Sequence, residues 1–187
     1  NLWSTNSVSY TYLSLKTKPF VILAGISGTG KSKLVRLFAE SINAKFKSIP
    51  VKPDWNDSTE LLGYKNIKDE FVKGELYKVI DEAKEHLDTP YFVCLDEMNL
   101  ARVEYYLSEY LSVIESRKVE TDKIVTDKLF SESYFENVED NNISIPENLY
   151  IIGTVNMDDT TFSFSRKVLD RANTIEFSEV DLETLDF

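Results

Sequence analysis

A short glycine-rich segment lies between an apolar run and a helical pattern, and it limits the folds open to this chain more than any other part of the sequence. The apolar run covers 20–24 and leads into Gly25-x-x-x-x-Gly30-Lys31-Ser32, and helical periodicity follows over 31–42. This spacing is the Walker A pattern, and a strand before it and a helix after it are the context that the pattern requires. The order therefore predicts a phosphate-binding loop in a parallel α/β fold.

A loop of this kind holds phosphate oxygens mainly with its backbone. The N–H groups point into a concavity, glycine lets the backbone approach without a Cβ, and the helix N-terminus adds a positive dipole end. We expect Lys31 to place a point charge on the β- and γ-phosphates and Ser32 to offer its hydroxyl to Mg²⁺. The residues expected to bind the nucleotide are Gly25, Ser27, Gly28, Thr29, Gly30, Lys31, Ser32 and Lys33.

A second apolar run, 91–95, ends in the carboxylates Asp96 and Glu97. A strand that is apolar throughout is covered on both faces, as in a parallel sheet, and ligands of such sheets bind at the carboxyl ends of the strands. This pattern is typical of Walker B. We expect Asp96 to ligate or support Mg²⁺, and Glu97 to polarise the attacking water as a general base.

Two more polar residues, Asn156 and Arg171, are candidates for the same site. Asn156 follows another apolar run, where its amide would orient water against the γ-phosphate as sensor 1, although a strand-terminal Asn is also a common turn former. Arg171 closes a short helix before the last expected strand. It would reach the γ-phosphate of a neighbouring subunit as an arginine finger. The alternative for Arg171 is a local salt bridge with Asp170 or Glu176.

Apolar strands and helices alternate along the chain, which predicts a mostly parallel five-stranded sheet between helices. With 187 residues, 42% of them apolar, the chain is long enough for one domain with a core. Strands are expected at 20–24, 46–51, 91–95, 149–154 and 174–177, and helices at 31–42, 75–86, 102–115 and 167–171.

The expected organisation has three parts. Residues 1–18 form an N-terminal entry segment, 19–178 form the nucleotide-binding subdomain, and 179–187 begin a connection to a helical lid. Within the subdomain, the polar and acidic stretch 116–148 is expected to be a surface insertion, such as a hairpin. The sequence starts without an initiator Met, so we expect a fragment of a longer protein in which the lid is missing or truncated.

Charge and cysteine content restrict the binding partners and the cellular compartment that we expect. The formal net charge of −11 argues against broad electrostatic binding of nucleic acid by this segment, and leaves a local basic patch or another domain as the route to DNA. The single cysteine, Cys94, lies inside an expected strand, which favours a core residue in a reducing cytoplasm. No apolar run approaches the ~20 residues that span a bilayer, so a cytoplasmic protein without a membrane partner is expected.

These motifs occur in the order typical of the AAA+ superfamily, which the chain resembles. More narrowly, it resembles the McrB-like NTPases, the motor subunits of McrBC-type modified-DNA restriction systems. In that family's Met-Asn-Thr-Ala-Asp signature, Asn156 and Asp159 match the two polar positions. The resemblance covers roughly residues 18–178 and rests on 95–102, 153–160 and 164–172, with 53–55 and 61–64 in support.

The resemblance implies the large subdomain of an AAA+ P-loop NTPase that hydrolyses GTP rather than ATP, with Mg²⁺, in a homo-oligomeric ring, typically a hexamer. It implies a McrC-like partner that stimulates hydrolysis and recruits or contains the nuclease, and DNA recognition by a separate N-terminal domain. The catalytic set implied is Lys31, Glu97, Asn156, Asp159 and Arg171.

Departures from the family pattern keep alternatives open. The family's Glu-Ile-Asn-Arg is here Glu97-Met98-Asn99-Leu100, with Arg102 two places later. ATP remains an option for the nucleotide, since no guanine-reading motif is present. The first rival function is an ATP-driven chaperone or remodeller of the MoxR or dynein-related type. The second is a nucleotide-gated assembly module with little turnover.

Overall fold

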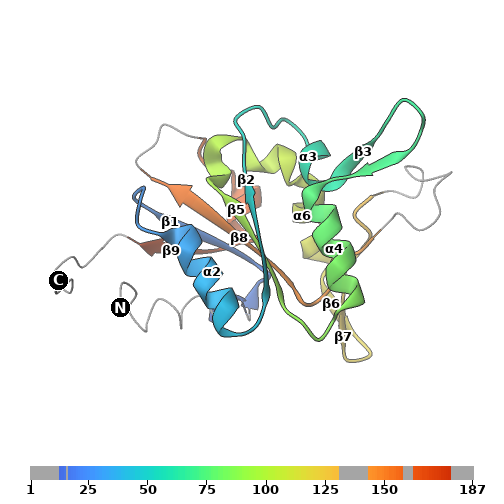
Figure 1. The fold of residues 1–187 in the computed structure, drawn as a ribbon, viewed down its shortest axis with the longest axis horizontal. Helices are drawn as coiled ribbons and strands as arrows, with labels where there is room; N and C mark the ends of the chain where they lie inside the picture. The colour runs from blue at the N-terminus through green and yellow to red at the C-terminus, as the bar shows by residue number, and fades with distance from the viewer. Residues whose placement is uncertain (1–12, 16, 131–142, 158–161, 178–187) are drawn as a thin grey trace.

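A five-stranded parallel sheet forms the centre of the computed structural model, which describes residues 13–15, 17–130, 143–157 and 162–177 (Figure 1). The strand order is β2-β5-β8-β1-β9, and every neighbouring pair is parallel. This confirms the predicted fold class. The strands are β1 (Phe20–Gly25), β2 (Lys45–Pro50), β5 (Tyr91–Asp96), β8 (Leu149–Asn156) and β9 (Asn173–Phe177).

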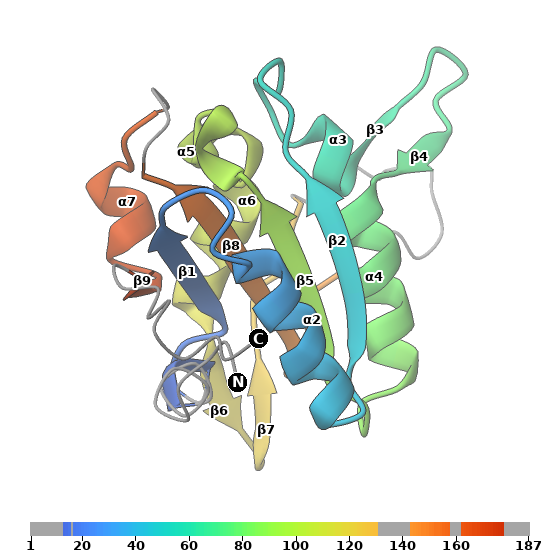
Figure 2. The same ribbon diagram turned by 60° about the vertical axis from the view of Figure 1, so that its left-hand side comes forward.

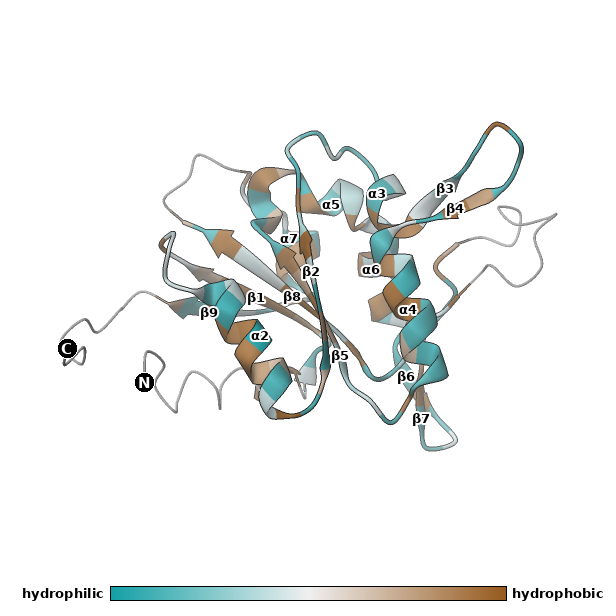
Figure 3. Cartoon of the chain, in the orientation of Figure 1, coloured by the Kyte–Doolittle hydropathy of each residue, from teal (hydrophilic) through white to brown (hydrophobic). Residues whose placement is uncertain are grey.

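Alternate side chains of each central strand enter two different cores, because successive strand residues point to opposite faces. Phe20 and Ile22 of β1 pack with α4 (Glu75–Glu85) and α6 (Ser108–Val113) on one face. Val21 and Leu23 pack with α2 (Lys31–Ser41) on the other. Figure 2 shows α2 in front of the sheet. Both α2 and α4 carry apolar and polar residues, as expected for helices that cover a sheet (Figure 3).

Cys94 lies in the core beneath α2 and is fully buried. Burial, with the nearby Asp96 carboxylate adding to it, raises the pKa of the Cys94 thiol to about 12. Because the thiolate is the reactive form, we expect a thiol reagent at pH 8 to leave Cys94 unmodified in the native protein and to modify it fully in denaturant. Mass spectrometry after timed labelling measures both states, and rapid native labelling would contradict this burial.

The expected helix over 102–115 is divided in the structure. It forms α5 (Val103–Tyr106), α6 and the 3-10 turn η2 (Ile114–Ser116), with the break at Leu107, whose φ of −112° and ψ of 13° are not helical. Two buried tyrosines are anchored on either side of the break: the Tyr106 hydroxyl donates to the Met98 carbonyl, and that of Tyr110 to the Pro19 carbonyl. These side chains therefore serve packing.

Two antiparallel hairpins extend the sheet domain. The first, β3 (Gly63–Lys65) with β4 (Phe71–Lys73), follows the short helix α3 (Thr59–Leu62) and was not predicted. It projects away from the sheet beside α3 (Figure 1). Gly74 closes its base: a Cβ there would lie 2.3 Å from the Leu61 carbonyl oxygen, so the close approach requires glycine.

The second hairpin, β6 (Lys118–Glu120) with β7 (Lys123–Val125), lies in the stretch that was expected to be a surface insertion. That expectation needs a correction, because Leu129, Ile143 and Ile145 of the same stretch are buried in the core with α4 and α6. Removing these apolar side chains from water stabilises the fold.

Parts of the predicted organisation lie outside the described residues. These are most of the entry segment 1–18 and the whole of 179–187. Within the described residues, no helix combines the length and the apolar character needed to cross a membrane.

Candidate functional site

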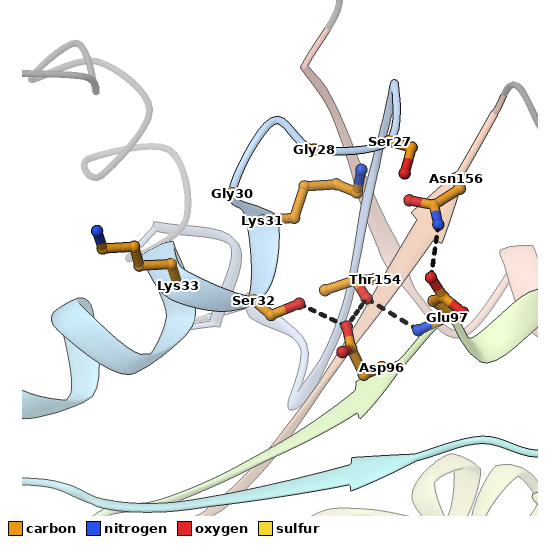
Figure 4. Close-up of a pocket in the computed structure, with 10 residues that line it drawn as sticks. All are labelled: Ser27, Gly28, Gly30, Lys31, Ser32, Lys33, Asp96, Glu97, Thr154 and Asn156. Carbon is orange, nitrogen blue, oxygen red and sulfur yellow. Dashed lines mark hydrogen bonds between the residues drawn. The ribbon is translucent and has the colours of Figure 1, made fainter.

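The carboxyl ends of three adjacent strands meet the loop between β1 and α2. In the sheet register, Gly25 of β1 lies opposite Asn156 of β8, and Leu95 of β5 lies opposite Gly153 of β8. The ends of β5 and β8 therefore come together in front of the loop and enclose a pocket of about 230 Å³ (Figure 4). Its lining residues are Ser27, Gly28, Gly30, Lys31, Ser32, Lys33, Asp96, Glu97, Thr154 and Asn156.

The loop takes the backbone shape that its glycines allow. Gly28 and Gly30 have φ values of 77° and 75°, in the left-handed region where a Cβ is unfavourable. Gly25 is required by space instead, because a Cβ would lie 2.6 Å from the carbonyl oxygen of Phe177 on β9. The loop therefore curves back over the strand ends, and Gly30 begins the helix as the N-cap of α2.

Lys31 lies under this loop and is only 5% exposed. Its Nζ donates to the carbonyl oxygens of Gly25, at 3.0 Å, and Ile26, at 2.8 Å. Neutral carbonyl oxygens satisfy the ammonium donors without cancelling its charge. The side chain is thus held where phosphate oxygens in the pocket would meet a positive charge.

Asp96 receives two hydroxyl donors on one carboxylate oxygen. Its Oδ1 accepts a hydrogen bond from Ser32 Oγ at 2.5 Å and another from Thr154 Oγ1 at 2.6 Å (Figure 4). Ser32 belongs to the loop side and Thr154 to β8, so Asp96 links the first turn of α2 to the central strands.

Glu97 faces Asn156 across the end of the sheet. The Asn156 side-chain amide donates to Glu97 Oε1 at 3.0 Å, and the Glu97 backbone N–H donates to Thr154 Oγ1, also at 3.0 Å. Glu97 has a left-handed backbone, with φ of 51° and ψ of 48°, at the start of the 3-10 turn η1 (Met98–Leu100). Such a conformation in a non-glycine residue is strained and is held by its surroundings.

The 3-10 turn η1 joins the site to the segment after β8. The Asn99 side-chain amide donates to the Asn156 carbonyl at 3.4 Å, and the Phe162 N–H donates to the Asn99 carbonyl at 3.1 Å. Asn99 is 4% exposed. The polar residues after Walker B therefore connect to the sensor strand, whereas Arg102 lies over the rings of Tyr105 and Phe162, away from the pocket lining.

Ser32 and Asp96 provide oxygen ligands of the kind that bind Mg²⁺. Mg²⁺ prefers hard oxygen ligands and uses one or two protein side chains, completing its shell with phosphates and water. The adjacent hydroxyl and carboxylate supply that chemistry. Among the described residues, no group of three or more His, Cys, Asp or Glu side chains could hold a metal ion, so a site shared with a phosphate ligand suits this pocket better than an all-protein site.

Arg171 does not line this pocket. Its Nε donates to the Leu111 carbonyl at 2.7 Å, it forms an ion pair with Glu115, and its side chain is 14% exposed. The local salt-bridge alternative named Asp170 or Glu176 as partner, and the structure shows Glu115 instead. These contacts hold α7 (Arg166–Leu169) and its end against α6. The arginine-finger role for a neighbouring subunit stays a prediction.

Nine of the lining residues were predicted from sequence. Gly25 and Thr29, which were also predicted to bind the nucleotide, are not among the lining residues, and the Thr29 hydroxyl donates to the Ile26 carbonyl at 2.9 Å within the loop. Asp159 lies in 158–161, outside the described residues. Thr154 lines the pocket and was missed as a site residue. A signal existed: Thr154 is polar in an apolar strand and lies two positions before Asn156, which places both side chains on one strand face.

The chain belongs to the AAA domain family, in its dynein-related subfamily, whose model matches residues 20–172. It is 27% identical over 176 residues to the type IV methyl-directed restriction enzyme EcoKMcrB subunit of Escherichia coli strain K12, covering 90% of this chain. These two matches confirm the predicted resemblance to McrB-like AAA+ proteins. The chain spans 36% of that relative's length.

Solved structures agree on the fold. A structure of a putative ATPase from Cytophaga hutchinsonii superimposes with a TM-score of 0.60 at 18% identity, covering 95% of this chain and 47% of the other. At that identity the likeness concerns the fold alone. Fold, family and site together define a nucleoside-triphosphatase domain of the AAA+ type, a class that uses a nucleotide and usually Mg²⁺.

Proposed function

We propose that this domain hydrolyses GTP in an oligomeric motor that drives restriction of modified foreign DNA together with a McrC-like nuclease partner. The observation that carries hydrolysis is the Glu97–Asn156 pair, which stands across the pocket from the Walker A loop. The similarity to the EcoKMcrB subunit, which belongs to a methyl-directed restriction enzyme, supports the assignment to restriction. The assignments to GTP and to a hexameric ring follow from the resemblance of the motifs to the McrB-like family.

The chemistry proposed here relies on position and charge more than on covalent steps. Lys31 and the amides of the loop hold the phosphates, and a bound Mg²⁺, held by Ser32 and Asp96, supplies further neutralisation of charge. Glu97 accepts a proton from the attacking water, while the Asn156 amide orients Glu97 and the water. Arg171 of a neighbouring subunit, released from Glu115, completes the site as a finger in this proposal.

The nucleotide preference is tested by titration of GTP and ATP into the protein by calorimetry with Mg²⁺, followed by turnover with each. The proposal expects tighter binding and faster turnover with GTP. Preference for ATP would favour a remodeller instead, an alternative that the dynein-related family match supports. Binding of neither nucleotide would overturn both.

Dependence on protein concentration is the second expected result. Because the finger is supplied by a neighbour, turnover per subunit should rise with concentration and level off as rings assemble, by about 10³-fold if the finger contributes as arginine fingers do elsewhere. Phosphate release is measured alongside the mass of the assembly by light scattering. A constant turnover per subunit, with the full rate in the monomer, would reject the shared site.

A further inference from the structure

Thr154 is the one lining residue of the pocket for which the motifs provide no role. It is 1% exposed and lies on β8, beside the end of β5, because Leu95 and Gly153 are register partners one position earlier. Its hydroxyl touches both members of the acidic pair: Oγ1 lies 2.6 Å from Asp96 Oδ1 and 3.0 Å from the Glu97 backbone nitrogen.

The direction of both hydrogen bonds follows from the partners. A backbone N–H can only donate, so the Thr154 oxygen accepts from Glu97. An ionised carboxylate can only accept, so the single hydroxyl proton of Thr154 goes to Asp96. One hydroxyl thus donates to the Asp96 carboxylate and accepts from the Glu97 N–H. Valine has the same shape but no hydroxyl, so it can do neither.

The bond to the Glu97 nitrogen restrains the strained backbone of Glu97. That residue has φ of 51°, and in this conformation its carboxylate accepts a hydrogen bond from the Asn156 amide. Thr154 and Asn156 lie on the same face of one strand, so the strand holds both the backbone and the side chain of Glu97. Loss of the hydroxyl would free Glu97 to relax and move its carboxylate away from the Asn156 amide.

The hydrogen bond to Asp96 has a different role, which is to orient the Asp96 carboxylate. Ser32 also donates to Asp96 Oδ1, but it belongs to the first turn of α2, next to the phosphate-binding loop. Thr154 belongs to the central sheet, which is the more rigid support. When Ser32 turns its oxygen to another partner in the pocket, Thr154 remains as the fixed donor that orients the Asp96 carboxylate.

We infer that Thr154 is a positioning residue for hydrolysis, which fixes Asp96 and the backbone of Glu97 through one hydroxyl and leaves nucleotide binding to the loop. The inference rests on the proposed nucleotide hydrolysis. It assigns Thr154 an effect on the rate of the chemical step, since its oxygen contacts the acidic pair, whereas Gly30 and Lys31 take their conformation from the loop itself.

The test compares Thr154→Val with the wild type in the oligomeric protein. Turnover should fall about 10- to 100-fold, the range expected from losing hydrogen bonds to a charged group and to a strained backbone, while the nucleotide dissociation constant changes less than about threefold. Thr154→Ser keeps the hydroxyl and should keep most of the turnover. Thr174→Val, on the exposed face of β9, is the matched control and should leave turnover unchanged.

A second pair of variants keeps the test informative if Thr154→Val does not fold. Thr154→Ser and Thr154→Ala both lack the γ-methyl group, and only the serine keeps the hydroxyl, so the rate difference between them reports the hydroxyl alone. Hydrogen–deuterium exchange of a peptide spanning 95–100 gives a readout apart from activity, since the Glu97 amide should exchange faster in Thr154→Ala than in Thr154→Ser.

Each result decides one question. Equal turnover in the serine and alanine variants, with equal exchange at Glu97, would overturn the role of Thr154 while wild-type hydrolysis stands. Parallel losses of nucleotide affinity and turnover would overturn it as well, because a positioning role separates the two. Absence of nucleotide binding in the wild type would instead overturn the proposed function on which the inference rests.

Discussion

Replacing Lys31 by alanine is expected to abolish detectable nucleotide binding and to lower turnover by at least about 100-fold, as loss of one placed donor to a developing charge does in other enzymes. The reason is that the Gly25 and Ile26 carbonyls, at 3.0 and 2.8 Å, hold the buried Lys31 ammonium at the phosphate-binding loop, where it lines the pocket. Calorimetry with Mg²⁺-nucleotide and a phosphate-release assay measure the two effects.

The matched control is Lys84→Ala, which removes the same charge from the exposed last turn of α4. It should bind and turn over nucleotide as the wild type does. Because Lys31 is itself buried, thermal unfolding must show that Lys31→Ala remains folded. A folded Lys31→Ala variant with wild-type affinity would show that phosphates are not held at this loop.

Replacing Glu97 by glutamine is expected to stop hydrolysis and preserve nucleotide binding. Glutamine keeps the shape and an oxygen that accepts from the Asn156 amide, but it cannot take a proton from water. General bases contribute about 10²- to 10⁴-fold, so turnover should fall within that range while the dissociation constant stays close to wild type. The bound nucleotide, recovered after rapid filtration and analysed by chromatography, should remain a triphosphate.

This variant also separates the enzyme from the assembly module. If the domain is a motor, Glu97→Gln assembles with nucleotide and does not turn over; if it is only an assembly module, the variant and the wild type show the same low turnover. Glu85→Gln, on the exposed end of α4, is the control for the charge change and should hydrolyse normally. Wild-type turnover in Glu97→Gln would remove Glu97 from the catalytic role.

Local sequence was sufficient for the elements that carry the motifs. The apolar runs that end at Gly25, Asp96 and Asn156 form neighbouring strands, since residues buried on both faces of a parallel sheet must be apolar throughout. The glycine spacing before Lys31 gives positive φ at Gly28 and Gly30, because glycine populates the left-handed region readily. The loop, the acidic pair and the sensor asparagine could therefore be placed at one sheet edge in advance.

Contacts between distant segments could not be placed in this way. The stretch 116–148 is polar in composition, yet Leu129, Ile143 and Ile145 enter the core, because burial depends on what the fold brings above them. Arg171 pairs with Glu115 rather than with a neighbour in sequence, since the turn after α7 lies against α6. Sequence spacing carries no information about such partners.

Periodicity and glycine spacing are local properties of the chain, and they were enough to predict a P-loop α/β domain and nine of the residues around its pocket. Which of these residues contact one another depends on how the strands pair in the folded sheet. The bonds of Thr154 to Asp96 and Glu97, and of Asn156 to Glu97, join residues 57 to 59 positions apart. They exist because parallel pairing of β5 with β8 brings two strand ends together, and that pairing is a property of the whole sheet.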